Sequence, residues 1–252
     1  MRLLSLCPST TLSLFQLGVG NRLVGVTRYC VHPAEAVASI EKVGGTKNPK
    51  LARILELGPD LVFLNREENR REDWEALQAA GIACHLSYPR TVHQVIQTVL
   101  DFGQVLGVTD SAAQLVDEIV VARDHARKQV PTYDLSWVYL IWRKPWMAVN
   151  NETYISSLIC EAGGRNALAH RQQTYPEVSA AELSECDPDL VLLSSEPFPF
   201  KSKHIDELAM ATGLPASRFR LVDGELLSWH GSFTARGLEY ASGLIGIRGV
   251  GN

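Results

Sequence analysis

The feature that most constrains the fold is a regular alternation of short apolar segments with segments of helical periodicity. Residues 2–6, with Leu3, Leu4 and Leu6, are expected to form a short buried strand, and Pro8 then opens a segment whose apolar positions recur at helix spacing up to Gly18. Further strands are expected at 23–27, 60–64, 82–86, 136–142, 189–193 and 219–222. Helices are expected at 51–57, 74–80, 92–106, 153–162, 179–186, 202–211 and from about 234. This alternation predicts an α/β protein whose parallel sheets are covered by helices on both faces.

One expected helix is longer than a crossover within a small domain requires. It begins at the cap Thr109-Asp110-Ser111, keeps apolar positions up to Val130 and closes at Pro131. A helix of about 20 residues spans roughly 30 Å. We therefore expect an N-terminal α/β lobe over 1–108, a connecting backbone helix over 109–130 and a C-terminal α/β lobe over 131–252. The predicted fold is two Rossmann-like lobes joined by a single long helix.

An internal echo supports two similar lobes. Residues 54–64 match residues 183–193 at a constant offset of 129, and both segments contain Pro-Asp-Leu-Val-x-Leu. The same offset places Glu67 opposite Glu196. The two copies lie on either side of the expected connector, as a repeated lobe would require.

Composition and charge exclude several classes of partner. The 252 residues carry a formal net charge of -4, which provides no basic field for nucleic acid. No apolar run approaches the roughly 18 residues of a membrane-spanning helix. The five cysteines are widely spaced and indicate neither a zinc site nor a disulfide framework. The chain as written shows no signal peptide, so we expect a cytoplasmic protein, or a periplasmic or extracytoplasmic one if a leader is missing.

Polar and aromatic residues gather just after the expected strands, where parallel α/β sheets bind ligands. Aromatic rings supply contact area at low entropic cost, and a few polar groups fix the orientation of a ligand. The predicted ligand-binding residues are Ser9, Arg28, Tyr29, His32, Lys47, Asn65, Arg66, Tyr88, Arg143, Trp146, Tyr154, Tyr175, Phe198, Trp229 and His230. This set favours one sizeable, partly flat small molecule in a cleft between the lobes.

Signals for catalysis are weak. The chain has no Walker A lysine motif, no H-E-x-x-H and no G-x-S-x-G, and no resident metal site or catalytic cofactor is expected. An enzyme using the cleft remains an alternative, with His32 or His230 as acid or base and Glu67 or Glu196 as its partner. A sensor or partner-binding module is a second alternative.

Taken together, the residues resemble the substrate-binding proteins of ABC importers for vitamin B12, haem and ferric siderophores, and most closely the cobalamin-binding type, a helical-backbone metal receptor family. The resemblance lies in residues 4–11, 24–28, 43–46, 59–62, 80–82, 162–166 and 187–191 and in the connector. It implies a class III periplasmic-binding-protein-like fold and a non-enzymatic role. The implied ligand is cobalamin or another corrinoid, haem or a ferric siderophore.

A corrinoid or metal-chelate binding protein is the leading hypothesis, and it gives individual residues a role. Tyr29, Trp146, Phe198 and Trp229 would wall the ligand, Arg28 and Arg143 would meet its amides or carboxylates, and His32 or His230 would approach a metal. Family members dock on an ABC permease through a glutamate on each lobe. The candidates are Glu67, Glu68 and Glu72 on the first lobe and Glu196 on the second. Without a leader, an intracellular carrier of the same ligand class is the alternative to an importer component.

Overall fold

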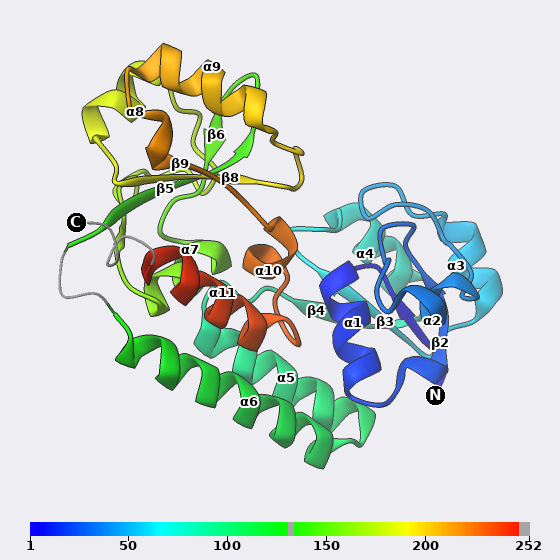
Figure 1. Cartoon of the computed structure of the whole chain (residues 1–252). Helices are drawn as coiled ribbons and strands as arrows, with labels where there is room; N and C mark the ends of the chain where they lie inside the picture. Colours follow the sequence, from blue (N-terminus) through cyan, green and yellow to red (C-terminus); the bar gives the residue numbers. More distant parts are fainter. Residues whose placement is uncertain (131–133, 247–252) are drawn as a thin grey trace. The chain divides into compact units, whose positions relative to one another are not determined.

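The protein divides into two compact units, each built on its own sheet. A computed structural model describes residues 1–130 and 134–246 (Figure 1). The first unit comprises residues 1–89, 93–117 and 230–232, and the second comprises residues 90–92, 118–229 and those from 233 on.

The first unit follows the predicted alternation of strands and helices. Its elements are β1 (Leu3–Ser5), α1 (Pro8–Gln16), η1 (Gly20–Arg22), β2 (Leu23–Val26), α2 (Ala34–Ala38), α3 (Leu51–Leu57), β3 (Leu61–Asn65), α4 (Arg71–Ala79), β4 (Ala83–Ser87) and α5 (Val92–Leu106). Pro8 opens α1 at a position where its missing N–H costs no hydrogen bond. Gly58 ends α3 in the left-handed conformation at φ 54°.

The four strands of the first sheet are all parallel, in the order β2-β1-β3-β4. Side chains alternate between its faces. Leu4 and Val62 pack against α3 and α4 in one core, whereas Phe63 points the other way and meets Phe102 of α5 at a ring distance of 5.2 Å. The sheet is thus covered on both faces, as expected for parallel strands.

The second unit also resumes the alternation. Its elements are β5 (Ser136–Trp142), β6 (Met147–Ala148), α7 (Tyr154–Glu161), β7 (Arg165–Asn166), α8 (Ala180–Cys186), β8 (Leu190–Ser194), α9 (Ser202–Thr212), η2 (Ala216–Arg218), β9 (Phe219–Val222), α10 (Gly224–Ser228) and α11 (Thr234–Gly246). Strands β5, β8 and β9 are parallel neighbours, and β7 pairs parallel with β5.

The second sheet departs from the predicted parallel pattern at one edge. Strand β6 pairs antiparallel with β5, with Trp142 opposite Met147, so residues 142–147 form a short hairpin. Leu183 of α8 and Leu208 of α9 pack in one core with Val138 and Val191 of the sheet. Figure 1 shows α8 and α9 on one side of this sheet and α7, α10 and α11 on the other.

The internal echo corresponds to a repeated structural element. Helix α8 and strand β8 span 180–186 and 190–194, each 129 residues after α3 at 51–57 and β3 at 61–65. Asp187 ends α8 in the left-handed conformation at φ 41°, as Gly58 does for α3. Both strands occupy the third place in their sheet orders. The predicted two-lobed α/β fold with largely parallel sheets is confirmed.

The predicted connector is a single helix, α6 (Thr109–Lys128). Its last turn contains His125, Arg127 and Lys128, and positively charged side chains there stabilise the helix by interacting with the negative end of its dipole. Its residues up to Asp117 belong to the first unit and those from Glu118 to the second. The predicted stop at Pro131 lies outside the described residues. Throughout 1–130 and 134–246, no helix is long and apolar enough to span a membrane.

Candidate ligand-binding site

The carboxyl ends of the first sheet carry a continuous set of loops, named here the first face: residues 28–29, 45–48, 65–69 and 87–88. Arg28 lies over the Tyr29 ring at 5.7 Å and faces Asn48 Oδ1 at 3.5 Å. A Cβ at position 45 would lie 3.2 Å from the Tyr29 ring, so Gly45 leaves room for the ring to lie close to the backbone. Lys47 donates to the backbone carbonyl of Glu67. The loops after β2 and β3 are therefore joined through residues 45–48.

Two asparagines hold the first face together from beneath. Asn69 Nδ2 donates to the carbonyls of Leu6 at 3.0 Å and Thr46 at 3.1 Å, and Asn69 Oδ1 accepts from the Asn65 N–H at 2.8 Å. Asn65 Oδ1 accepts from the Glu67 N–H at 2.9 Å. These bonds satisfy backbone groups that the turn after β3 would leave unpaired. The two asparagines thereby fix the turn on which Arg66 stands, with its guanidinium over the Tyr88 ring at 5.0 Å.

His230 belongs to the first unit and lies in its buried polar layer. Its Nε2 faces Asn65 Nδ2 at 3.1 Å, and the Asn65 amide also reaches Ser87 Oγ at 3.3 Å. Burial lowers the pKa of His230 to about 4 from its ordinary 6.5, because the charged form loses its hydration. The imidazole is therefore neutral at physiological pH, and because the Asn65 Nδ2 group can only donate, His230 Nε2 is the acceptor.

A second anchor holds the same segment against α1. Ser13 Oγ donates to the Ser9 carbonyl at 2.9 Å and accepts from the Ser232 N–H at 3.0 Å. Gly231 between the two anchors has φ 86°, and a Cβ there would lie 2.3 Å from Ser13 Oγ. This segment thus requires a glycine for both its conformation and its contact.

The carboxyl ends of β5 and β8 in the second unit carry an aromatic cluster, named here the second face: Trp142, Arg143, Trp146, Phe198 and Phe200. Trp142 and Phe198 meet edge to face at 5.8 Å, Phe198 and Phe200 at 4.9 Å, and Trp146 stacks on Phe200 at 6.1 Å. Phe200 is buried, whereas 41% of Trp142 is exposed. The second face therefore offers ring surface that a flat ligand could cover.

Arg143 is the charged group of the second face, and it is already paired. Its Nε and Nη2 both lie 2.9 Å from the Glu207 carboxylate, and its guanidinium lies 5.8 Å from the Trp146 ring. The bidentate contact lowers the pKa of Glu207, because Arg143 favours the ionised carboxylate. His204 packs on Phe198 at 5.3 Å, and desolvation together with Arg143 lowers its pKa. The Arg143–Glu207 pair is thus neutral as a unit, whereas Lys144 near Glu207 and Lys201 and Lys203 near His204 add positive charge to this end of the unit.

Trp229 is held within the second unit by Glu196. Glu196 Oε1 accepts from Trp229 Nε1 at 2.9 Å and from Ser228 Oγ at 2.7 Å, and Trp229 stacks on Phe233 at 5.7 Å. Glu196 is one of the predicted permease-docking residues, and this oxygen is engaged inside its own unit. On the first unit, Glu67 and Glu68 are partly buried and Glu72 is exposed in α4.

Exposure divides the predicted ligand-binding residues into three groups. Arg28, Tyr29, Lys47 and Arg66 are exposed, and His32, Tyr88, Arg143, Trp146, Tyr175 and Phe198 are partly buried. Ser9, Asn65, Tyr154, Trp229 and His230 are buried. The Tyr154 hydroxyl, for example, bonds to Thr234 Oγ1 at 2.9 Å. As placed here, the buried group supports neighbouring side chains. A direct ligand contact for any member of the set remains a prediction.

Two residues that contact candidate site residues were missed from the sequence. Glu207 and His204 both lie in α9, and Glu207 is 64 residues from Arg143. No short-range pattern signals such a pair. Asn65 and Asn69 are spaced four residues apart after a strand, which is a detectable turn signal.

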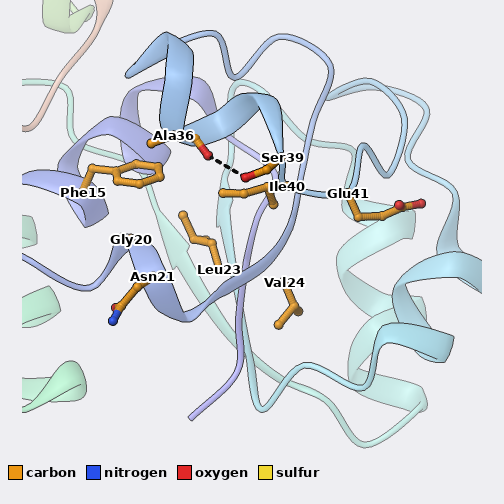
Figure 2. A pocket seen from close by; sticks show the side chains of 9 residues that line it. All are labelled: Phe15, Gly20, Asn21, Leu23, Val24, Ala36, Ser39, Ile40 and Glu41. Atoms are coloured by element: carbon orange, nitrogen blue, oxygen red, sulfur yellow. Dashed lines mark hydrogen bonds between the residues drawn. The ribbon is translucent and has the colours of Figure 1, made fainter.

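The first unit also carries a hollow that is separate from the first face. It has a volume of about 580 Å³ and is lined by Phe15, Gly20, Asn21, Leu23, Val24, Ala36, Ser39, Ile40 and Glu41 (Figure 2). Leu23 and Val24 begin β2, whereas Arg28 follows its end. The hollow therefore lies toward the amino end of β2. The loops where parallel α/β sheets bind ligands lie at the carboxyl ends of the strands.

The chain belongs to the periplasmic binding protein family, whose profile matches residues 3–218. This confirms the family predicted from the sequence.

Individual relatives are distant but similar over most of their length. A vitamin B12-binding protein of Photorhabdus laumondii is 26% identical over 195 residues, which cover 77% of this chain and 70% of that protein. A periplasmic vitamin B12-binding protein of Vibrio cholerae has a TM-score of 0.83 at 19% identity, over 99% of this chain and 98% of that one. A periplasmic haem-binding protein of Roseiflexus sp. RS-1 has a TM-score of 0.84 at 22% identity, covering 97% and 96%. At these identities the solved structures show a shared fold.

Proposed function

We propose that this protein binds a metal chelate of the corrinoid or haem class, without chemical turnover. The observation that carries the proposal is the second face, where Trp142, Trp146 and Phe198 offer ring surface beside Arg143. Aromatic walls with few polar groups suit a large, flat ligand. Relatives named for vitamin B12 or haem support the choice of ligand class.

The first face supports the same proposal from the other unit. It presents Tyr29 and Tyr88, each beside an arginine, on loops fixed by Asn65 and Asn69. Such preorganised loops lower the cost of ordering side chains upon binding.

We further propose that the protein delivers its ligand to an ABC permease from an extracytoplasmic location. Relatives described as periplasmic binding proteins support this role. Glu72 on α4 is an exposed docking candidate, and Glu67, Glu68 and Glu196 remain candidates. An intracellular carrier of the same ligand is the alternative. Copurification with a permease encoded beside the gene would favour the importer role, and its absence from such a complex would favour the carrier.

Titration with cobalamin, haem and a ferric siderophore, followed by tryptophan fluorescence, tests the ligand class. We expect at least one to bind with a Kd below about 100 μM, or roughly -5.5 kcal/mol. Trp146→Ala removes part of the aromatic wall and should weaken binding about 10-fold. Met210→Ala is the control, because Met210 lies in α9 with 87% of its surface exposed.

The outcomes separate the proposals. If none of the three chelates binds below about 100 μM, the ligand class is wrong. If Trp146→Ala and Met210→Ala bind equally well, the second face does not contact the ligand. Recovery of the chelate with an altered absorption spectrum or mass after incubation would favour the enzyme alternative instead.

A further inference from the structure

Strand β4 lies at the edge of the first sheet. In the strand order β2-β1-β3-β4 it pairs, within the described residues, with β3 alone. An edge strand has backbone N–H and C=O groups along one side that no neighbouring strand satisfies. Such a row of groups is a template on which another extended chain can pair.

The register with β3 shows which groups of β4 point away from the sheet. The Ser87 carbonyl accepts from the Arg66 N–H at 2.9 Å, so the backbone of Ser87 is directed towards β3. In a parallel ladder every second residue of a strand bonds to a given neighbour, and the residues between them face the other side. Cys84 and Leu86 are therefore the residues whose backbone groups point outward. Neither forms a backbone hydrogen bond on that side with any part of the chain that the structure describes.

The edge lacks the features that usually prevent pairing. Natural edge strands are protected by charged side chains, prolines or bulges. Residues 83–87 contain no charged side chain and no proline, and their register with β3 is regular. Burial lowers the pKa of His85, which keeps this imidazole neutral at neutral pH. By contrast, β9 at the edge of the second sheet carries Arg220, and the outer side of β2 is occupied by a bridge between Val26 and Lys42.

The outward groups of β4 are complementary to those of a second copy in the antiparallel direction. Opposed residues in an antiparallel pair alternate between those that exchange two hydrogen bonds and those that exchange none. A two-fold axis beside His85 places Cys84 of each copy opposite Leu86 of the other, and these pairs exchange hydrogen bonds. His85 then lies opposite His85 of the second copy in the pair without bonds. All the outward groups of Cys84 and Leu86 are satisfied in this single register.

The side chains of β4 suit the same arrangement. Cys84 and Leu86 point to one face of the strand, where Cys84 packs against the core of the first unit and 42% of Leu86 is exposed. Pairing sets each Leu86 beside Cys84 of the second copy, so an apolar surface covers an apolar one. Like charges opposite one another would destabilise such a pair, and residues 83–87 bring none from either copy.

The size of the contact limits its strength. A standard interface buries about 800 Å² per partner, and one pair of short strands covers less. Interfaces at the small end of the range belong to weak or transient complexes. We therefore expect a dissociation constant for the dimer of about 10–100 μM.

We propose that β4 is a self-association edge, at which two copies of the chain pair antiparallel over residues 83–87. The pairing joins two four-stranded sheets into one continuous sheet across the two-fold axis. The partner is thus a second copy of this chain, recognised by its uncharged and self-complementary strand. The inference concerns assembly and stands independently of the chelate that the protein binds.

Analytical ultracentrifugation of the intact protein in reducing buffer tests self-association. As the concentration rises from about 1 to about 300 μM, the weight-average mass should increase from the 27.8 kDa of one chain towards twice that value. Leu86→Lys places a charge on the edge of each copy and should weaken association by about 10-fold or more. Leu55→Lys is the matched control, because Leu55 lies in α3 with a similar exposure of 47% and receives the same charge. This control should associate within about twofold of the wild type.

A thiol at position 85 tests the register. His85→Cys places the new thiol opposite its own copy in the pair without hydrogen bonds, where Cβ atoms lie about 4.5–5.5 Å apart. Mild oxidation should then yield a covalent dimer well above the background of the native cysteines, which the wild type measures. Leu55→Cys is the control and should yield no more covalent dimer than the wild type.

Each outcome supports or overturns the proposal. A mass that stays at that of one chain up to about 300 μM overturns it. Equal association of Leu86→Lys and Leu55→Lys also overturns it, because another surface then forms the dimer. A dimer that is sensitive to Leu86→Lys but gives no excess crosslink in His85→Cys overturns the antiparallel register centred on His85. Chelate binding is measured separately, so its failure and the failure of the dimer are distinguishable.

Discussion

Acidification should destabilise this protein through His230, and the size of the effect follows from its burial. Only 8% of His230 is exposed, and burial lowers its pKa to about 4 from an ordinary 6.5. Above pH 6.5 the imidazole is neutral in both the folded and the unfolded chain, so the free energy of unfolding does not depend on its protonation. Below pH 6.5 the unfolded chain binds a proton that the folded chain excludes. The free energy of unfolding therefore falls as the pH drops from about 6.5 to about 4.

The magnitude is worked from the same two values. At 1.36 kcal/mol per pH unit, the full loss is about 3 kcal/mol, of which about 2 kcal/mol is lost between pH 7 and pH 5. His85 and His204 also have lowered pKa values, so the wild-type protein alone does not isolate His230. His230→Gln keeps a polar partner for Asn65 but cannot bind the proton. The difference between wild type and variant then reports His230 alone.

The assay is urea unfolding at intervals between pH 5 and pH 8, with the histidine ring protons followed in parallel by NMR. We expect the free energy of unfolding of the wild type to fall by about 2 kcal/mol more than that of His230→Gln between pH 7 and pH 5. The ring protons of His230 should show no titration above pH 5. Equal pH dependence in the two proteins, or a His230 titration near pH 6.5, would refute the reasoning.

Two further substitutions have expected outcomes of known sign. Gly231→Ala should lower the free energy of unfolding by about 2 kcal/mol, because φ is 86° and the new Cβ would lie 2.3 Å from Ser13 Oγ. Its control is Gly243→Ala in α11, where nothing lies within 4 Å of the added Cβ. In urea unfolding, this control should raise the free energy of unfolding by about 0.5–1 kcal/mol, because alanine favours a helix over glycine. Equal effects at both sites would contradict the argument. Glu207→Gln should cost at most about 1 kcal/mol, because the partner of Arg143 is 38% exposed. That cost should disappear when unfolding is measured in 1 M salt, and a loss that persists there would show that packing rather than charge is responsible.

Much of the fold could be predicted because local signals agreed with one another. Helix α5 begins and ends where the apolar periodicity predicted, and β5 and β9 have the predicted bounds. The echo at an offset of 129 predicts two similar units, and it coincides with α3–β3 and α8–β8. Periodicity, caps and turns are properties of a few neighbouring residues, so a single sequence carries them.

The missed elements are those too short to show a period. Helices α2 and α10 have five residues each, and β6 and β7 have two. Strand β6 exists because it pairs with β5, and a pairing across a hairpin leaves little trace in two residues. The segment 142–146 was therefore predicted as an open loop rather than as the start of a hairpin.

The position of the candidate residues after strands could be predicted from the sequence, but their burial could not. Arg28, Arg66 and Trp146 lie in loops that follow strands, and their contact with a ligand stays a prediction. Nothing in the sequence distinguished these from Asn65 and His230, which lie beneath the surface and bond to one another. Whether a polar residue binds a ligand or supports a loop depends on partners far away in sequence, which local patterns do not report.

The most direct test of the central claim is equilibrium dialysis of the purified protein against cobalamin, haem and a ferric siderophore, with bound chelate quantified by absorption. The account predicts one chelate retained per chain, at a Kd below about 100 μM for at least one class. Retention of none of the three at that concentration would contradict it, because the two aromatic and cationic faces would then serve some other ligand.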